Sequence, residues 1–140
     1  MTTTKKLSIF ELFETDKTAE EEGKWFDTFG PEISLKIRRY SSKIARDGHN
    51  KLYSPVLKVY KTIDKVPENI GTDLTAKHLA RYVVADWKGV YDRSGEEIAF
   101  SPEAAETLFS ALPDFAKEVL LTSINMDNYR AANVESIKGN

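Results

Sequence analysis

Residues 73–112 read DLTAKHLARYVVADWKGVYDRSGEEIAFSPEAAETLFSAL, and this stretch decides the fold. In its first half, apolar residues recur at a spacing near 3.6, which predicts one face of a helix. Asp73 is a suitable N-cap, and Gly89 stands where a left-handed C-cap is usual. The helix is therefore expected to end just before Gly89, with its apolar face in the core. That face consists of Leu74, Leu79, Tyr82, Val83 and Trp87.

The second half of the stretch predicts a tight turn followed by another helix. Residues 92–95, Asp-Arg-Ser-Gly, have the composition of a type I turn between two short strands. Ser101 and Pro102 mark a helix start, because Ser caps well and the missing N–H of Pro costs nothing at the first helical position. A short β-hairpin is therefore expected between two helices. In the second helix Ala105, Leu108, Phe109 and Leu112 lie at positions i, i+3, i+4 and i+7.

An N-terminal hairpin is the other clear prediction. Between residues 32 and 40, Ile33, Leu35 and Ile37 alternate with polar residues, which is the period of a strand with one buried face. Gly30 and Pro31 mark a turn before it, so residues 24–29 are expected to form the first strand.

The segment between the two hairpins leaves two interpretations open. Residues 41–65 form either two helical pieces interrupted at residues 47–50, or one helix that kinks at Pro55. Residues 66–71 are expected to be a linker. After the quoted stretch, Pro113 is expected to end the helix before a last helix begins near Asp114.

Composition and these patterns indicate one α+β domain, residues 1–140, mostly α-helical and compact, with residues 1–7 and 133–140 frayed. The chain contains no cysteine, which excludes a disulfide framework, a thiol nucleophile and a cysteine metal site. No apolar run approaches the ~18 residues of a membrane span, so we expect no membrane association and a cytoplasmic protein.

The sequence carries no catalytic motif. It lacks a glycine-rich phosphate loop and a spacing of paired metal ligands. His49 and His78 are far apart in sequence, and His78 is expected at the surface or at the edge of the core. We therefore expect a protein that is not an enzyme and has no cofactor or metal.

Charge is segregated along the chain. Residues 1–35 have a net charge of −4, residues 36–65 of +7 and residues 66–140 of −5. Such segregation can guide association with a charged partner or with another copy of the chain. The basic segment 36–46 also contains Tyr40, and basic residues mixed with aromatics can bind nucleic acid. A nucleic-acid-binding regulatory domain that uses this segment is therefore an alternative function. Its basic residues are Lys36, Arg38, Arg39, Lys43 and Arg46.

The chain resembles the tail assembly chaperones of long-tailed bacteriophages. The resemblance extends from Phe10 to Arg130 and rests on scattered residues. They are residues 10–16 ending in Thr-Asp, Glu20, Glu22, Gly23, Trp25, the strand at 33–38, the basic stretch 39–50, Ala85, Trp87, Lys88, Gly89, the turn at 92–95, Phe100-Ser101-Pro102-Glu103 and Asn128-Tyr129-Arg130.

The resemblance implies a non-enzymatic binding protein of the bacterial host's cytoplasm that is absent from the mature virion. Proteins of that family bind the long tape-measure protein and keep it soluble while tail-tube subunits polymerise around it. The tape-measure protein is thus the expected partner, with the tail-tube protein and a second copy of the chain as further candidates. Leu121, Met126 and Tyr129 on the last helix are candidates for an exposed apolar binding face, unless they pack inward.

Overall fold

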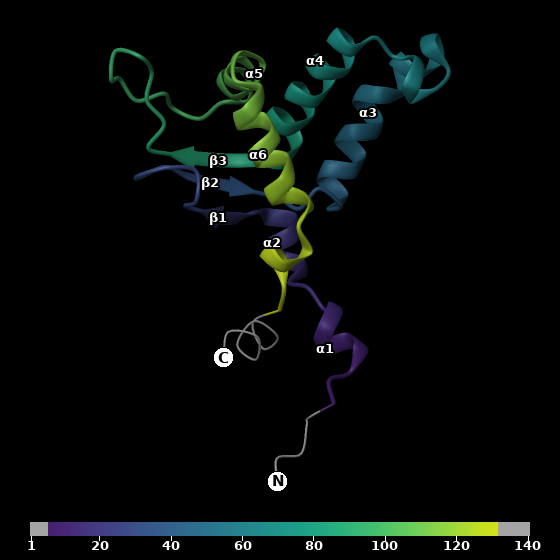
Figure 1. Cartoon of the computed structure of the whole chain (residues 1–140), viewed down its shortest axis with the longest axis vertical. Coiled ribbons are helices and arrows are strands. Elements are labelled where there is room, and N and C mark those ends of the chain that lie inside the picture. The colour runs from purple at the N-terminus through teal and green to yellow at the C-terminus, as the bar shows by residue number, and fades with distance from the viewer. Residues whose placement is uncertain (1–5, 132–140) are drawn as a thin grey trace.

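The computed structural model describes residues 6–131 of the chain (Figure 1). Within this range the fold is α+β and mostly helical, with a three-stranded antiparallel sheet. Of the fraying expected at residues 1–7 and 133–140, all but residues 6 and 7 lies outside the described residues, and these two belong to no helix or strand. In chain order the elements are α1 (Ile9–Phe13), α2 (Lys17–Glu22), β1 (Lys24–Phe26), β2 (Ser34–Ile37), α3 (Lys43–Tyr60), the 3₁₀ helix η1 (Ile63–Lys65), α4 (Glu68–His78), the π-helical η2 (Leu79–Val83), β3 (Val84–Lys88), α5 (Pro102–Ala111), α6 (Pro113–Ile124) and the 3₁₀ helix η3 (Met126–Tyr129).

The sheet has β2 at its centre, paired antiparallel with β1 and β3. The predicted N-terminal hairpin is confirmed, and Leu35 and Ile37 of β2 are fully buried. In Figure 1 helix α6 crosses in front of the sheet, and α5 lies above it beside α4. The core therefore forms where the helices meet the inner face of the sheet.

The quoted stretch contains a strand that its helical spacing does not predict. Helix α4 ends at His78, and the chain continues through the π-helical η2 into strand β3, which begins at Val84. The prediction of a helix up to Gly89 is therefore wrong. Pairing with β2 decides this, because Leu35 lies opposite Trp87 in the register. The expected core position of Trp87 is confirmed, and its indole Nε1 donates a hydrogen bond to the Ile98 carbonyl at 2.7 Å.

Gly89 is needed for close approach rather than for a helix cap. Its φ is +72°, and a Cβ on it would come within 2.1 Å of the Glu32 carbonyl oxygen. The turn that follows forms as predicted, with the Asp92 carboxylate accepting from the backbone N–H groups of Ser94 and Glu96. However, this turn connects β3 to α5, and its arms meet in a single bridge rather than in a hairpin between two helices.

Of the two interpretations of residues 41–65, the structure agrees with the one that has a single helix, α3. It runs without interruption through residues 47–50 and has Pro55 inside it. Gly48 lies against the Tyr82 ring, so this glycine provides space for packing and does not break the helix. The expected linker at residues 66–71 is also wrong, because α4 begins at Glu68 directly after Pro67.

The two later helices follow the predicted signals. Helix α5 begins at Pro102, and the Ser101 hydroxyl caps it by accepting from the Ala104 N–H at 3.0 Å. Helix α5 ends at Ala111, and Pro113 is the first residue of α6.

Candidate partner-binding surface

The basic segment 36–46 is largely used inside the molecule. Arg39 pairs with the buried carboxylate of Glu20 at 2.5 Å. Burial opposes ionisation of Glu20, but hydrogen bonds from Arg39 and Thr15 and the charge of Lys17 outweigh it, so the pKa of this carboxyl lies below its ordinary value. Arg38 donates to the backbone carbonyl of Glu21 at 3.0 Å. The two arginines therefore hold α2 against the end of β2.

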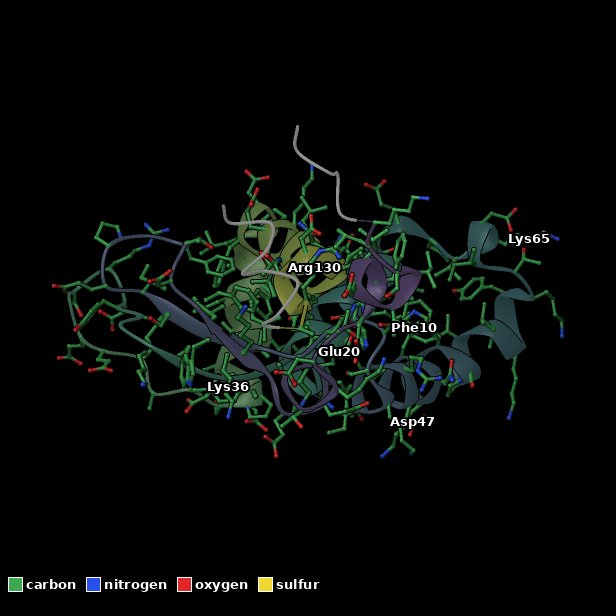
Figure 2. All side chains as sticks on the ribbon, turned by 90° about the horizontal axis from the view of Figure 1, so that it is seen from below. Phe10, Glu20, Lys36, Asp47, Lys65 and Arg130 are labelled. Carbon is green, nitrogen blue, oxygen red and sulfur yellow. The ribbon has the colours of Figure 1, made fainter. Side chains whose placement is uncertain are left out.

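Of the remaining basic residues, Lys43 and Arg46 lie one turn apart on α3, whereas Lys36 lies on strand β2. Lys43 pairs with Asp47 along α3, and Arg46 donates to the carbonyl of Ser41. In Figure 2 Lys36 lies on the sheet side of the molecule, away from the label of Asp47 on α3. Internal pairing and this separation leave a weak basis for nucleic-acid binding, which needs several free cations along one path.

A cluster of histidines and tyrosines packs α3 against α4. His78 is buried, and its Nε2 donates to the Ala45 carbonyl at 2.7 Å, so His78 lies in the core rather than at the surface or its edge. The ring of His49 meets the His78 ring edge-on with centroids 5.2 Å apart, and stacks on Tyr53 at 4.1 Å. Burial lowers the pKa of both imidazoles, and the nearby His49 lowers that of His78 further. Within residues 6–131 no group of three or more His, Asp or Glu side chains could hold a metal ion.

The three predicted partner-binding residues do not form one face. Tyr129 is only 1% exposed, and its hydroxyl donates to the Ile37 carbonyl at 2.8 Å, so Tyr129 takes the inward-packing alternative and is not part of an exposed face. The cause is that α6 ends at Ile124 and the short helix η3 turns Tyr129 back toward the sheet. Met126 is half-buried on η3, while Leu121 on α6 is 50% exposed.

The structure instead places an apolar hollow at the junction of α5 and α6. It has a volume of about 210 Å³. Tyr91 and Leu112 on its rim are half-exposed or more, which leaves it open to a partner side chain. The sequence contained these residues but gave no signal for the hollow, because three segments converge there. Its lining consists of Phe29, Ile33, Val90, Tyr91, Leu108, Leu112 and Phe115.

Acidic side chains dominate the chain around this hollow. Residues 89–118 carry seven acidic and two basic side chains. Arg81 on η2 neutralises one of the acids, Glu106, in an ion pair at 3.1 Å. An apolar hollow in acidic surroundings suits a helical partner with an apolar stripe flanked by Lys or Arg.

None of the helices within residues 6–131 is long and apolar enough to cross a membrane. No match was found among curated proteins or among solved structures. A family model described as YdaY prophage protein matches residues 31–140, which is well over half of the 140 residues. The chain therefore belongs to the YdaY prophage protein family.

Proposed function

We propose that this prophage protein is a tail assembly chaperone that binds the tape-measure protein and keeps it soluble until tail-tube subunits surround it. The proposal is non-enzymatic and places the chain in the host cytoplasm during assembly and outside the finished virion. Membership of a prophage family and the resemblance to tail assembly chaperones support it. The observation that carries it furthest is the open apolar hollow at the α5–α6 junction.

The hollow fits the needs of such a partner. A tape-measure protein is a long helical chain whose apolar stripes need cover before assembly. An amphipathic helix binds a groove by inserting a few apolar anchors, and the residues that line this hollow are aliphatic or aromatic. Acidic residues around the hollow would steer a basic helix toward it and leave the apolar contact to hold it.

The test is co-expression with the tape-measure protein of the same prophage, followed by pull-down and measurement of its soluble fraction. Wild-type chain is expected to raise the soluble fraction and to be captured with its partner. Tyr91→Ala and Leu112→Ala should each lower capture severalfold, because both remove exposed apolar area at the rim without emptying the core.

Val59→Ala is the matched control, since Val59 is an exposed apolar residue on α3. It should behave as wild type. A tape-measure protein that aggregates equally with and without the chain would overturn the proposed function, and equal capture by all four chains would remove the hollow as its binding site.

A further inference from the structure

A second hollow adjoins the apolar hollow at the α5–α6 junction. It has a volume of about 400 Å³ and lies between α6 and the segment that follows β1. Phe29 and Phe115 line both hollows, and their rings meet edge-on with centroids 6.2 Å apart. The two hollows are therefore neighbours on the surface, separated by this pair of rings. We call the second one the acidic hollow, and it is lined by Thr28, Phe29, Asp114, Phe115, Glu118 and Thr122.

The charged residues that line the acidic hollow have one sign. They are Asp114 and Glu118, which lie at i and i+4 and therefore on the same face of α6, one turn apart. Thr122 continues this face by a further turn. The lysine of α6, Lys117, lines a different hollow that α6 forms with α4 and α5. The face of α6 next to the apolar hollow is thus acidic, and α6 itself does not neutralise it.

Both carboxylates are exposed and free to meet a cation from outside. Within residues 6–131 neither of them forms an ion pair, whereas Glu20 and Glu106 each pair with an arginine. The helix dipole favours an acid in the first turn, which accounts for Asp114. Glu118 lies beyond that turn and has a like charge four residues before it, an arrangement that is unfavourable on a helix. A cation placed between these two carboxylates would relieve their repulsion.

We infer that the partner helix lies along this face of α6, with an apolar side chain in the apolar hollow and Lys or Arg side chains over Asp114 and Glu118. The inference rests on the proposed function and specifies which helices of the tape-measure protein are bound. Asp114 and Glu118 are about 6 Å apart along the axis of α6, so a partner that pairs with both presents two basic residues one turn apart. Because Phe115 lines both hollows, the apolar anchor of the partner lies within about two turns of these residues.

The two hollows then have different roles in recognition. The apolar hollow accepts any aliphatic or aromatic anchor, so it does not distinguish one apolar stripe from another. The carboxylates favour a stripe with basic residues beside it and oppose one with Asp or Glu there, because like charges that face each other weaken binding. Asp114 and Glu118 are therefore the residues that determine specificity at the proposed site.

Salt dependence of capture tests the inference. The tape-measure protein is co-expressed with the chain, captured through it, and washed at about 50 mM and about 500 mM salt. With the wild-type chain, the fraction retained should fall severalfold at the higher concentration, because salt screens exposed ion pairs. The double variant Asp114→Asn, Glu118→Gln should retain severalfold less at low salt and lose most of the salt response. Both side chains are exposed, so its circular dichroism spectrum should stay unchanged.

Glu103→Gln is the matched control. Glu103 is an exposed acid in the first turn of α5 that lines neither hollow, and Glu103→Gln changes the net charge as much as Glu118→Gln does. It should retain the partner and respond to salt as the wild-type chain does. Equal losses with Glu103→Gln and Glu118→Gln would show that the acids act only through their overall field, and would overturn the contact along α6.

Tyr91→Ala separates the inference from the proposed function. It removes apolar area and no charge, so it should lower retention by a similar factor at both salt concentrations. If Tyr91→Ala weakens capture while the double variant behaves as wild type, the partner uses the apolar hollow alone, so the inference fails and the proposed function stands. A wild-type chain that captures no tape-measure protein at either salt concentration would refute both.

Discussion

At the scale of single residues, two glycines inside helices have opposite roles. Gly48 in α3 lies under the Tyr82 ring, and a Cβ there would come within 2.1 Å of the Tyr82 Cγ. A Cβ on Gly71 in α4 would meet nothing within 4 Å. The sequence near each glycine does not distinguish them. The space beside Gly48 is filled by Tyr82, which is more than thirty residues away in the sequence, and no residue fills the space beside Gly71.

Gly48→Ala is therefore expected to destabilise the protein, and Gly71→Ala to stabilise it. Overpacking against a buried ring costs about 1–3 kcal/mol, while alanine at an open helical site gains about 0.4–1 kcal/mol. Urea unfolding measures both changes in the free energy of unfolding. Equal effects of the two substitutions would show that α3 does not pack against the Tyr82 ring of η2.

At the scale of elements, signals within a segment predicted strand β2 and helix α5, whereas pairing with a distant strand decided the structure of β3. Strand β2 and helix α5 were found because alternation and a Ser-Pro start lie within the segments themselves. Strand β3 was missed because β2, nearly fifty residues earlier, recruits it into the sheet. The apolar hollow at the α5–α6 junction was missed for the same reason, since its walls come from segments that meet only in the fold.

The packing of α3 on α4 should depend on pH through its histidines. Burial lowers the pKa of His78 and of His49 below the ordinary value of 6.5. Just below pH 6.5 the unfolded chain therefore binds protons that the folded chain does not, so stability is full above pH 6.5 and falls as the pH drops toward the folded pKa values. The expected slope is at most about 1.4 kcal/mol per pH unit for each histidine.

Urea unfolding between pH 7.5 and pH 5 should show this loss, and His78→Gln should reduce the slope. The depressed pKa of Glu20 acts in a separate window, because that stability is lost only as the pH falls below its ordinary value of 4.5. Stability that stays constant from pH 7.5 to pH 5 would contradict the role of the two imidazoles.

At the scale of the whole molecule, the fold redistributes the charge that the sequence segregates. In α2 the Glu20 carboxylate pairs with Arg39, and the Glu21 carboxylate accepts a hydrogen bond from the backbone N–H of Lys43. The basic segment 36–65 is thereby partly neutralised inside the fold, while residues 89–118 keep seven acidic and two basic side chains.

The place of Tyr129 also determines when the protein can finish folding. Its ring packs edge-on against Phe26 and its hydroxyl bonds to the carbonyl of Ile37, while its own carbonyl accepts from Asp16. A ribosome makes these three partners more than ninety residues before it makes Tyr129. The nascent chain therefore carries an uncovered sheet surface while more than ninety further residues are made, and it covers that surface only when Tyr129 emerges.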